Sequence, residues 1–185
     1  MTSKVCPSAA EAVAGIEDGA TMIGGFGRAG QPVGLIDALL ERGARELVVI
    51  NNNAGNGNTG LAALLAAGRV RKIICSFPRQ SDSDVFDRLY RAGKIELELA
   101  PQGTLAERNF GPIMAAAARS TVVQVDRVVE SGVIDPETVV TPGIFVARVV
   151  GVGERTWLRE GVFVGAADAE GNPNPSTVES RDENR

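Results

Sequence analysis

The stretch Gly24-Gly25-Phe26-Gly27-Arg28-Ala29-Gly30-Gln31-Pro32 decides how this sequence is interpreted. An apolar run at residues 20–23 precedes it and predicts a strand, and the leucines and isoleucine of residues 32–42 share one face of a predicted helix. Glycines allow positive φ values and let a ligand approach backbone N–H groups at the start of the helix. We therefore expect this loop to bind an anionic or acyl group.

The same loop allows two other interpretations. The first is an ordinary glycine-rich turn between a strand and a helix, without a ligand. The second is a dinucleotide site, because residues 25–30 match the G-x-G-x-x-G pattern of nicotinamide-binding folds. That pattern requires an acidic residue at the end of the next strand, where this chain has Asn51-Asn52-Asn53. The sequence therefore argues against a nicotinamide cofactor.

Strands and helices alternate from the N-terminal region to about residue 103. The pattern predicts strands at residues 20–23, 46–50, 70–76 and 94–99 and helices at residues 8–16, 32–42, 59–67 and 82–92. Such alternation indicates an α/β fold, in which an open, mainly parallel sheet carries helices on both faces. Ligands bind such sheets beyond the carboxyl ends of the strands, where we expect the loops 24–32, 51–58 and 76–81.

The pattern is less regular after residue 103. We expect a short helix at residues 112–119 and strands at residues 121–130 and 143–150. Gly, Asn, Pro, Ser and charged residues dominate from about residue 166, which predicts a disordered tail. The expected organisation is one α/β domain over residues 1–150, followed by a divergent C-terminal segment over residues 151–185.

Composition excludes several classes of function. The chain has 185 residues and a formal net charge of −4, which argues against nucleic acid or an anionic membrane as the partner. It has no histidine, which removes the histidine-based nucleophile pairs and the usual zinc sites. Cys6 and Cys75 form no C-x-x-C pair. Because neither a signal peptide nor a membrane span is indicated, we expect a cytoplasmic protein without a metal.

Side-chain amides follow two of the predicted strands. Asn52, Asn53 and Gly55 belong to the turn at residues 52–57, and Gln102 follows the strand at residues 94–99. Amide groups are suitable donors to the oxyanion that develops during acyl transfer. An ordinary Asn-Gly turn without a ligand would produce the same local sequence.

These motifs resemble, in order, those of the A chain of the glutamate-dependent, two-component 3-oxoacid CoA-transferases, that is, their alpha subunit. The resemblance rests on Asp18-Gly19, the loop at 24–32, Asn-Asn-Ala-Gly at 52–55, Pro-Gln-Gly-Thr-Leu-Ala-Glu-Arg at 101–108 and Thr-Pro-Gly-Ile-Phe-Val at 141–146. It covers roughly residues 8–150. Within the family, residues 75–83 are similar to the members that act on 3-oxoadipate rather than acetoacetate.

The resemblance implies that CoA moves from succinyl-CoA to 3-oxoadipate, in the β-ketoadipate pathway of aromatic catabolism, through a glutamyl-CoA thioester. The nucleophilic glutamate is then on a separate B subunit, so this chain has no catalytic nucleophile and works in a hetero-oligomer of A and B subunits. No cofactor is implied, because the CoA thioester is a substrate. By the same resemblance, Asn52 and Gln102 donate hydrogen bonds near the thioester carbonyl, and the CoA- and acyl-binding loops contain Gly24, Gly25, Phe26, Gly27, Gly30, Pro32, Asn53 and Gly55.

Both 3-oxoadipate and the succinyl group carry a distal carboxylate, which the protein must meet with a cation or with hydrogen-bond donors. We hypothesise that Arg79 binds this carboxylate. The alternative is a solvated surface arginine.

The chain differs from the family in one place. Family members have several tens of additional residues between the positions of Arg108 and Asn109, and these residues supply part of the sheet and of the acyl pocket. Their absence uncovers backbone groups and apolar surface. Two other functions are therefore possible for the sequence: a non-catalytic remnant or binding module of the same fold, or a CoA-transferase for another 3-oxoacid such as acetoacetate.

Overall fold

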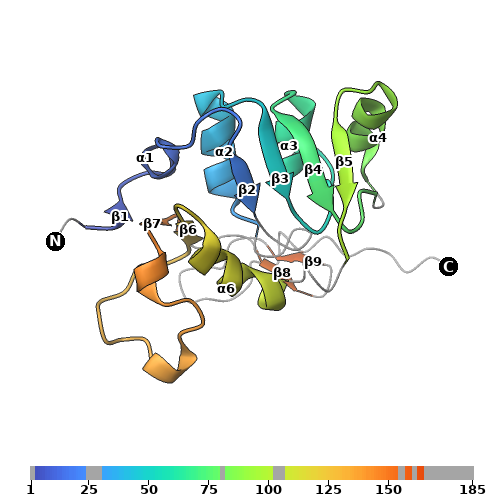
Figure 1. Cartoon of the computed structure of the whole chain (residues 1–185). Helices are drawn as coiled ribbons and strands as arrows, with labels where there is room; N and C mark the ends of the chain where they lie inside the picture. Colours follow the sequence, from blue (N-terminus) through green and yellow to red (C-terminus); the bar gives the residue numbers. More distant parts are fainter. Residues whose placement is uncertain are drawn as a thin grey trace.

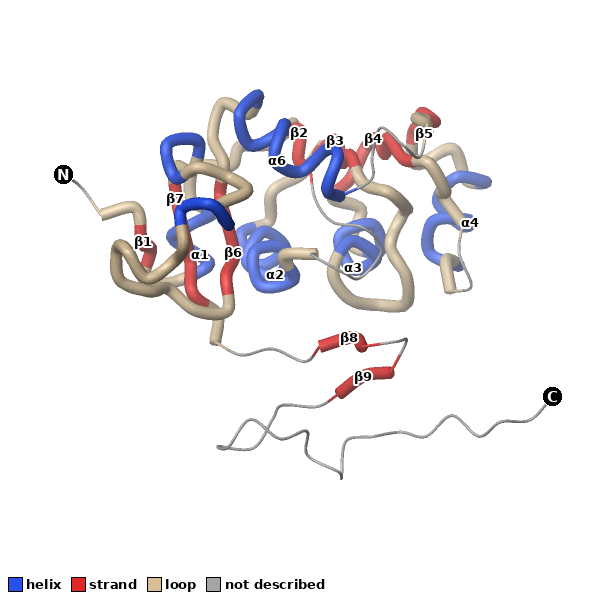
Figure 2. Tube along the Cα trace, turned by 90° about the horizontal axis from the view of Figure 1, so that it is seen from below, coloured by secondary structure: helices blue, strands red, loops and turns tan. Residues whose placement is uncertain are grey.

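A computed structural model describes residues 3–23, 31–79, 82–101, 107–153, 157–159 and 162–164 (Figure 1). Its larger sheet is parallel, with the strand order β2 (Thr21–Ile23), β3 (Leu47–Ile50), β4 (Val70–Cys75) and β5 (Glu96–Leu99). The helices between these strands are α2 (Val33–Arg42), α3 (Leu61–Ala66) and α4 (Asp84–Arg91). All three lie on one face of this sheet (Figure 2). The predicted α/β fold with a parallel sheet is confirmed.

A second parallel sheet joins the two ends of the described chain. Its order is β1 (Val5–Cys6), β7 (Arg148–Gly151) and β6 (Val122–Val125). Helix α1 (Ala9–Val13) follows β1 and contacts both β7 and α2. A separate antiparallel pair, β8 (Trp157–Arg159) and β9 (Val162–Val164), lies in the C-terminal segment.

The core is one cluster of buried apolar side chains that includes residues from both sheets. Val13 of α1, Leu39 of α2, Ile73 of β4, Phe86 of α4 and Val150 of β7 all belong to it. Helix α2 contributes Leu35, Ile36, Ala38 and Leu39, whose spacing gives the apolar face that the sequence predicts. This helix ends at Gly43, whose φ of +84° lets its N–H bond to the Leu39 and Leu40 carbonyls.

The second half of the chain differs from the sequence prediction. Helix α6 (Glu107–Ala117) begins five residues before the expected residue 112 and contains Pro112, which has no N–H to donate within the helix. The valine-rich strand expected at residues 121–130 is limited to β6, because β6 pairs with β7 over only four residues. At residues 143–150, a 3₁₀ turn, η2 (Gly143–Phe145), precedes the short strand β7. β-propensity alone does not make a strand where no neighbouring strand is present.

The segment between β6 and β7 extends away from the sheets (Figure 1). It contains a second 3₁₀ turn, η1 (Pro136–Thr138), and several exposed apolar residues. Val140 is 73% exposed and Ile144 is 80% exposed. The tail predicted from residue 166 lies outside the described residues.

Candidate active site at the carboxyl edge of the larger sheet

Two loops lie side by side where β3 and β4 end. We call residues 51–57 the asparagine loop and residues 76–83 the arginine loop; residues 80 and 81 of the latter lie outside the described residues. The Ser76 and Phe77 N–H groups donate to the Asn52 carbonyl at 3.1 and 3.0 Å. The Gly57 N–H donates to the Asp82 carbonyl at 2.9 Å. The arginine loop is therefore attached to the asparagine loop near both of its ends.

The asparagine loop buries three amide side chains in a row. Asn51, Asn52 and Asn53 are 4%, 2% and 1% exposed. Part of their hydrogen-bonding capacity shapes the loop: Asn51 Nδ2 donates to the Asn53 carbonyl at 3.0 Å, and Asn53 Oδ1 accepts from the Gly55 N–H at 2.8 Å. The latter bond is an Asx turn, which fixes the course of the backbone after the strand.

Other polar atoms of the two loops are buried without a hydrogen-bond partner. In the described part of the chain these are Asn51 Oδ1, Asn52 Nδ2, Asn53 Nδ2 and Ser76 Oγ. Leaving such a group unpaired costs about 1–3 kcal/mol, so an unpaired group in a folded protein calls for an explanation. Two amide NH₂ groups and one hydroxyl at the ligand-binding edge of a parallel sheet can serve a carbonyl or carboxylate oxygen of a substrate.

Glycine is required at two positions around the asparagine loop. Gly55 has a φ of +84°, and a Cβ atom placed on it would lie 2.6 Å from the Ala62 backbone nitrogen of α3. Gly60, which precedes α3, also has a positive φ, and a Cβ atom there would collide with the Gln31 side chain. The end of the glycine-rich loop is therefore packed against the start of α3, close to the asparagine loop.

The start of α2 is held from the other sheet. Pro32 is the residue that caps this helix, as predicted, and its side chain makes no capping bond. The Leu35 N–H donates instead to Gln124 Oε1 of β6 at 3.1 Å. Neither Gln124 nor Ser76 was predicted from the sequence. Only the place of Ser76, directly after a predicted strand, could have signalled it, because Gln124 lies within a valine-rich run.

Several predicted site residues lie outside the described residues. They are Gly24, Gly25, Phe26, Gly27, Gly30 and Gln102. Of the remaining predicted residues, the structure brings Asn52, Asn53 and Gly55 together in the asparagine loop and places Pro32 at the start of α2. The binding roles of all these residues stay predictions.

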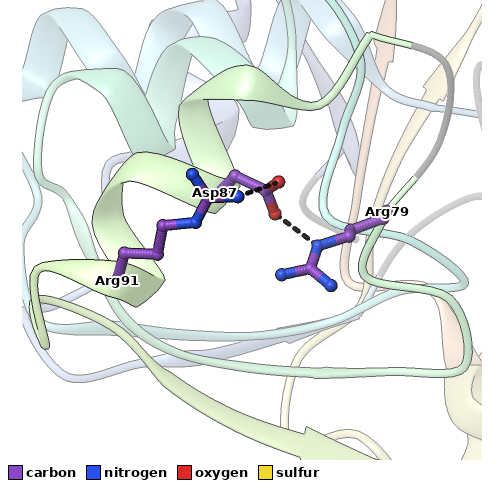
Figure 3. Close-up of polar contacts among 3 residues, drawn as sticks. All are labelled: Arg79, Asp87 and Arg91. Atoms are coloured by element: carbon purple, nitrogen blue, oxygen red, sulfur yellow. Dashed lines mark hydrogen bonds and ion pairs between the residues drawn. The ribbon is translucent and has the colours of Figure 1, made fainter.

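Arg79 is an exposed residue of the arginine loop, but it has an ionic partner (Figure 3). Its Nε atom donates to Asp87 Oδ1 at 2.5 Å, and Asp87 Oδ2 lies 3.7 Å from Arg91 Nη2. The hydrogen bond to Asp87 and the charge of that carboxylate raise the pKa of Arg79. Arg79 is 58% exposed, so this side chain is neither buried nor simply solvated.

Cys75, the last residue of β4, is fully buried, and this burial raises the pKa of its thiol to about 11. The thiol therefore stays protonated at neutral pH and is not a nucleophile. Among the described residues, no group of His, Cys, Asp and Glu side chains is arranged to hold a metal ion. None of the helices in that part of the chain has the length and apolar character needed to cross a membrane.

Comparison with known proteins places the chain in a family. The family model described as coenzyme A transferase matches residues 6–110 and 107–151. The chain belongs to the coenzyme A transferase family. The A chain of the 3-oxoadipate CoA-transferase of Pseudomonas putida is 47% identical over 219 positions, which cover 82% of this chain and 95% of that protein. The protein of the same description from Acinetobacter baylyi is 44% identical, over 82% of this chain and 96% of that protein.

The fold of this coenzyme A transferase chain is also that of a solved relative. The structure of an acyl-CoA transferase from Escherichia coli O157:H7, determined as a thioester complex with CoA, matches with a TM-score of 0.66 and 19% identity. The match covers 85% of the present chain and 48% of that chain, so the transferase chain described here spans about half its length. At this identity the likeness concerns the fold alone.

The alignment with the Pseudomonas putida relative also shows where residues are missing. It has 219 positions, whereas 82% of 185 residues is about 152, so some 67 positions have no residue in this chain. The two ranges matched by the family model meet at residues 107–110. These residues are the first turn of α6, which agrees with the break predicted between Arg108 and Asn109.

Proposed function

We propose that this chain is the A component of a two-component CoA-transferase that moves CoA from succinyl-CoA to 3-oxoadipate. The observation that carries the proposal is the 44–47% identity to the A chains of two 3-oxoadipate CoA-transferases. The buried amides at the carboxyl edge of the larger sheet give this chain a matching role. In this proposal, the chain positions the acyl group and stabilises charge, and the nucleophilic glutamate belongs to the B subunit.

The proposed chemistry begins when the B-subunit carboxylate attacks the thioester carbonyl of succinyl-CoA. Negative charge then develops on the carbonyl oxygen. Asn52 Nδ2 and Asn53 Nδ2 are buried donors without partners in the described part of the chain, and we assign them to this oxygen, with Gln102 as a third amide. Such donors cost little reorganisation because the folded loop already holds them. The glutamyl-CoA thioester that follows then passes CoA to 3-oxoadipate.

The proposal includes a hetero-oligomer of A and B subunits in the cytoplasm, with no cofactor besides the CoA substrates. Exposed apolar side chains between β6 and β7, Val140 and Ile144 among them, support a protein partner, because apolar patches of this kind mark interaction surfaces.

The decisive experiment is coexpression of this chain with a family B subunit, followed by an assay of CoA transfer from succinyl-CoA to 3-oxoadipate and, in parallel, to acetoacetate. Intact mass must first give the 19.3 kDa of the chain. A stable complex with transfer to 3-oxoadipate is the expected result. A preference for acetoacetate would change the assigned substrate.

A second candidate function is a non-catalytic remnant or binding module of the same fold. It is favoured by one observation, the roughly 67 family positions without a residue in this chain. A complex with the B subunit that transfers no CoA to any 3-oxoacid would support it.

A further inference from the structure

The arginine loop holds a charged group beside the proposed acyl site. Its first residues are bonded to the Asn52 carbonyl, and near its other end the Asp82 carbonyl accepts from the Gly57 N–H. Phe77 also forms a β-bridge with Asn53. Arg79 therefore lies in a segment whose backbone follows the buried amides, two residues after the bridge.

The geometry of the Arg79 guanidinium is set by α4. Asp87 takes the Nε atom, and both terminal nitrogens of Arg79 point away from this carboxylate (Figure 3). Of the residues that the structure describes, Asp87 alone makes a hydrogen bond or ion pair with the Arg79 side chain. A guanidinium fixed through Nε keeps its two Nη atoms as a planar fork, which is the edge that binds a carboxylate with two parallel hydrogen bonds.

The charge of the cluster favours an anion. Asp87 faces Arg79 with one oxygen and Arg91 with the other, so two guanidinium groups share one carboxylate. The three residues together carry one net positive charge. Asp87 is 25% exposed and Arg79 is 58% exposed, which leaves the fork accessible to a ligand.

We propose that Asp87 is a positioning residue for substrate selection, which orients Arg79 so that its Nη fork binds the distal carboxylate of a dicarboxylic acyl group. This inference rests on the proposed function and deepens it by assigning the discrimination between dicarboxylic and monocarboxylic acids. A simple surface ion pair would have the opposite effect, because Asp87 would then neutralise Arg79 and weaken its attraction for an anion.

The test measures binding and catalysis in the complex with the B subunit. The variants are D87N, which keeps the shape of the side chain and removes its charge, and R79K, which keeps the charge and removes the fork. R88Q is the matched control, because Arg88 is an exposed cation of the same helix that takes no part in the ion pairs of Asp87 with Arg79 and Arg91. Adipate and hexanoate, which have equal length, serve as the dicarboxylic and monocarboxylic probes.

We expect D87N and R79K each to weaken adipate binding about tenfold and to raise the KM for 3-oxoadipate similarly, with hexanoate binding and the KM for acetoacetate within twofold of wild type. R88Q should behave as wild type. Unchanged or tighter adipate binding in D87N overturns the inference. Adipate binding that depends on Asp87 in a complex without transfer to 3-oxoadipate would overturn the proposed function alone.

Discussion

At the scale of single residues, three neighbouring asparagines have given up almost all contact with solvent, although their side chains are polar. A fold tolerates this when the amides are bonded, and Asn51 and Asn53 partly satisfy one another and the Gly55 N–H. The NH₂ groups of Asn52 and Asn53 are not satisfied by the described residues. We interpret this as stability given up in favour of binding.

Asn52→Asp tests that interpretation. The change keeps the shape and the Oδ1 acceptor of the side chain but removes its donor, and it places negative charge where an oxyanion should develop. In the complex with the B subunit we expect kcat to fall by about 10²–10³, the usual loss for one oxyanion donor. Asn58→Asp, at an exposed position just beyond the asparagine loop, is the control. Equal, small losses in both variants would contradict the role of Asn52.

Gly55→Ala tests the backbone of the same loop. The added Cβ atom meets a positive φ and lies 2.6 Å from the Ala62 nitrogen. We expect a loss of about 2–4 kcal/mol in the free energy of unfolding, measured with a denaturant. Gly68→Ala is matched to it, because Gly68 has a φ of +64° with nothing within 4 Å of the added atom. It should cost only about 1 kcal/mol. Similar costs would mean that the close approach at Gly55 is unimportant.

At the scale of elements, the glycine-rich stretch correctly indicated a strand before it and a helix after it. The apolar spacing of α2 and the carboxyl-edge position of the asparagine loop could also be predicted, because they follow from local periodicity and from the direction of parallel strands. The link between Gln124 and α2 could not, since it joins residues 89 positions apart. The partner of Arg79 was likewise hidden, because Asp87 is one of several charged residues in α4.

Substitution of Gln124 tests how α2 is held. Gln124→Leu removes the acceptor of the Leu35 N–H, and we expect it to lower the free energy of unfolding by about 1 kcal/mol. Gln124→Glu keeps an acceptor and adds a negative charge at the start of a helix, which is favourable. It should therefore be at least as stable as wild type. The prediction fails if thermal and denaturant unfolding give the two variants the same stability.

At the scale of the whole molecule, the buried thiol of Cys75 links stability to pH. The pKa of this group rises from 9.0 to about 11 on burial, so the folded chain keeps a proton that the unfolded chain loses. The stabilisation is complete below pH 9 and is lost as the pH rises toward 11. We expect the free energy of unfolding to fall by ~2–3 kcal/mol over this interval relative to Cys75→Ala. Parallel pH profiles of the two proteins would contradict the prediction.

The second sheet carries a consequence for the order in which this protein folds. Val5 pairs with Val149 and Cys6 pairs with Val150, so the first strand of the described chain has its only strand partner almost at the end of it. During synthesis, β2 to β5 leave the ribosome together and can pair early, whereas β1 waits for β7. A nascent or truncated chain that stops before residue 148 therefore has the larger sheet but lacks the partner of its own N-terminus.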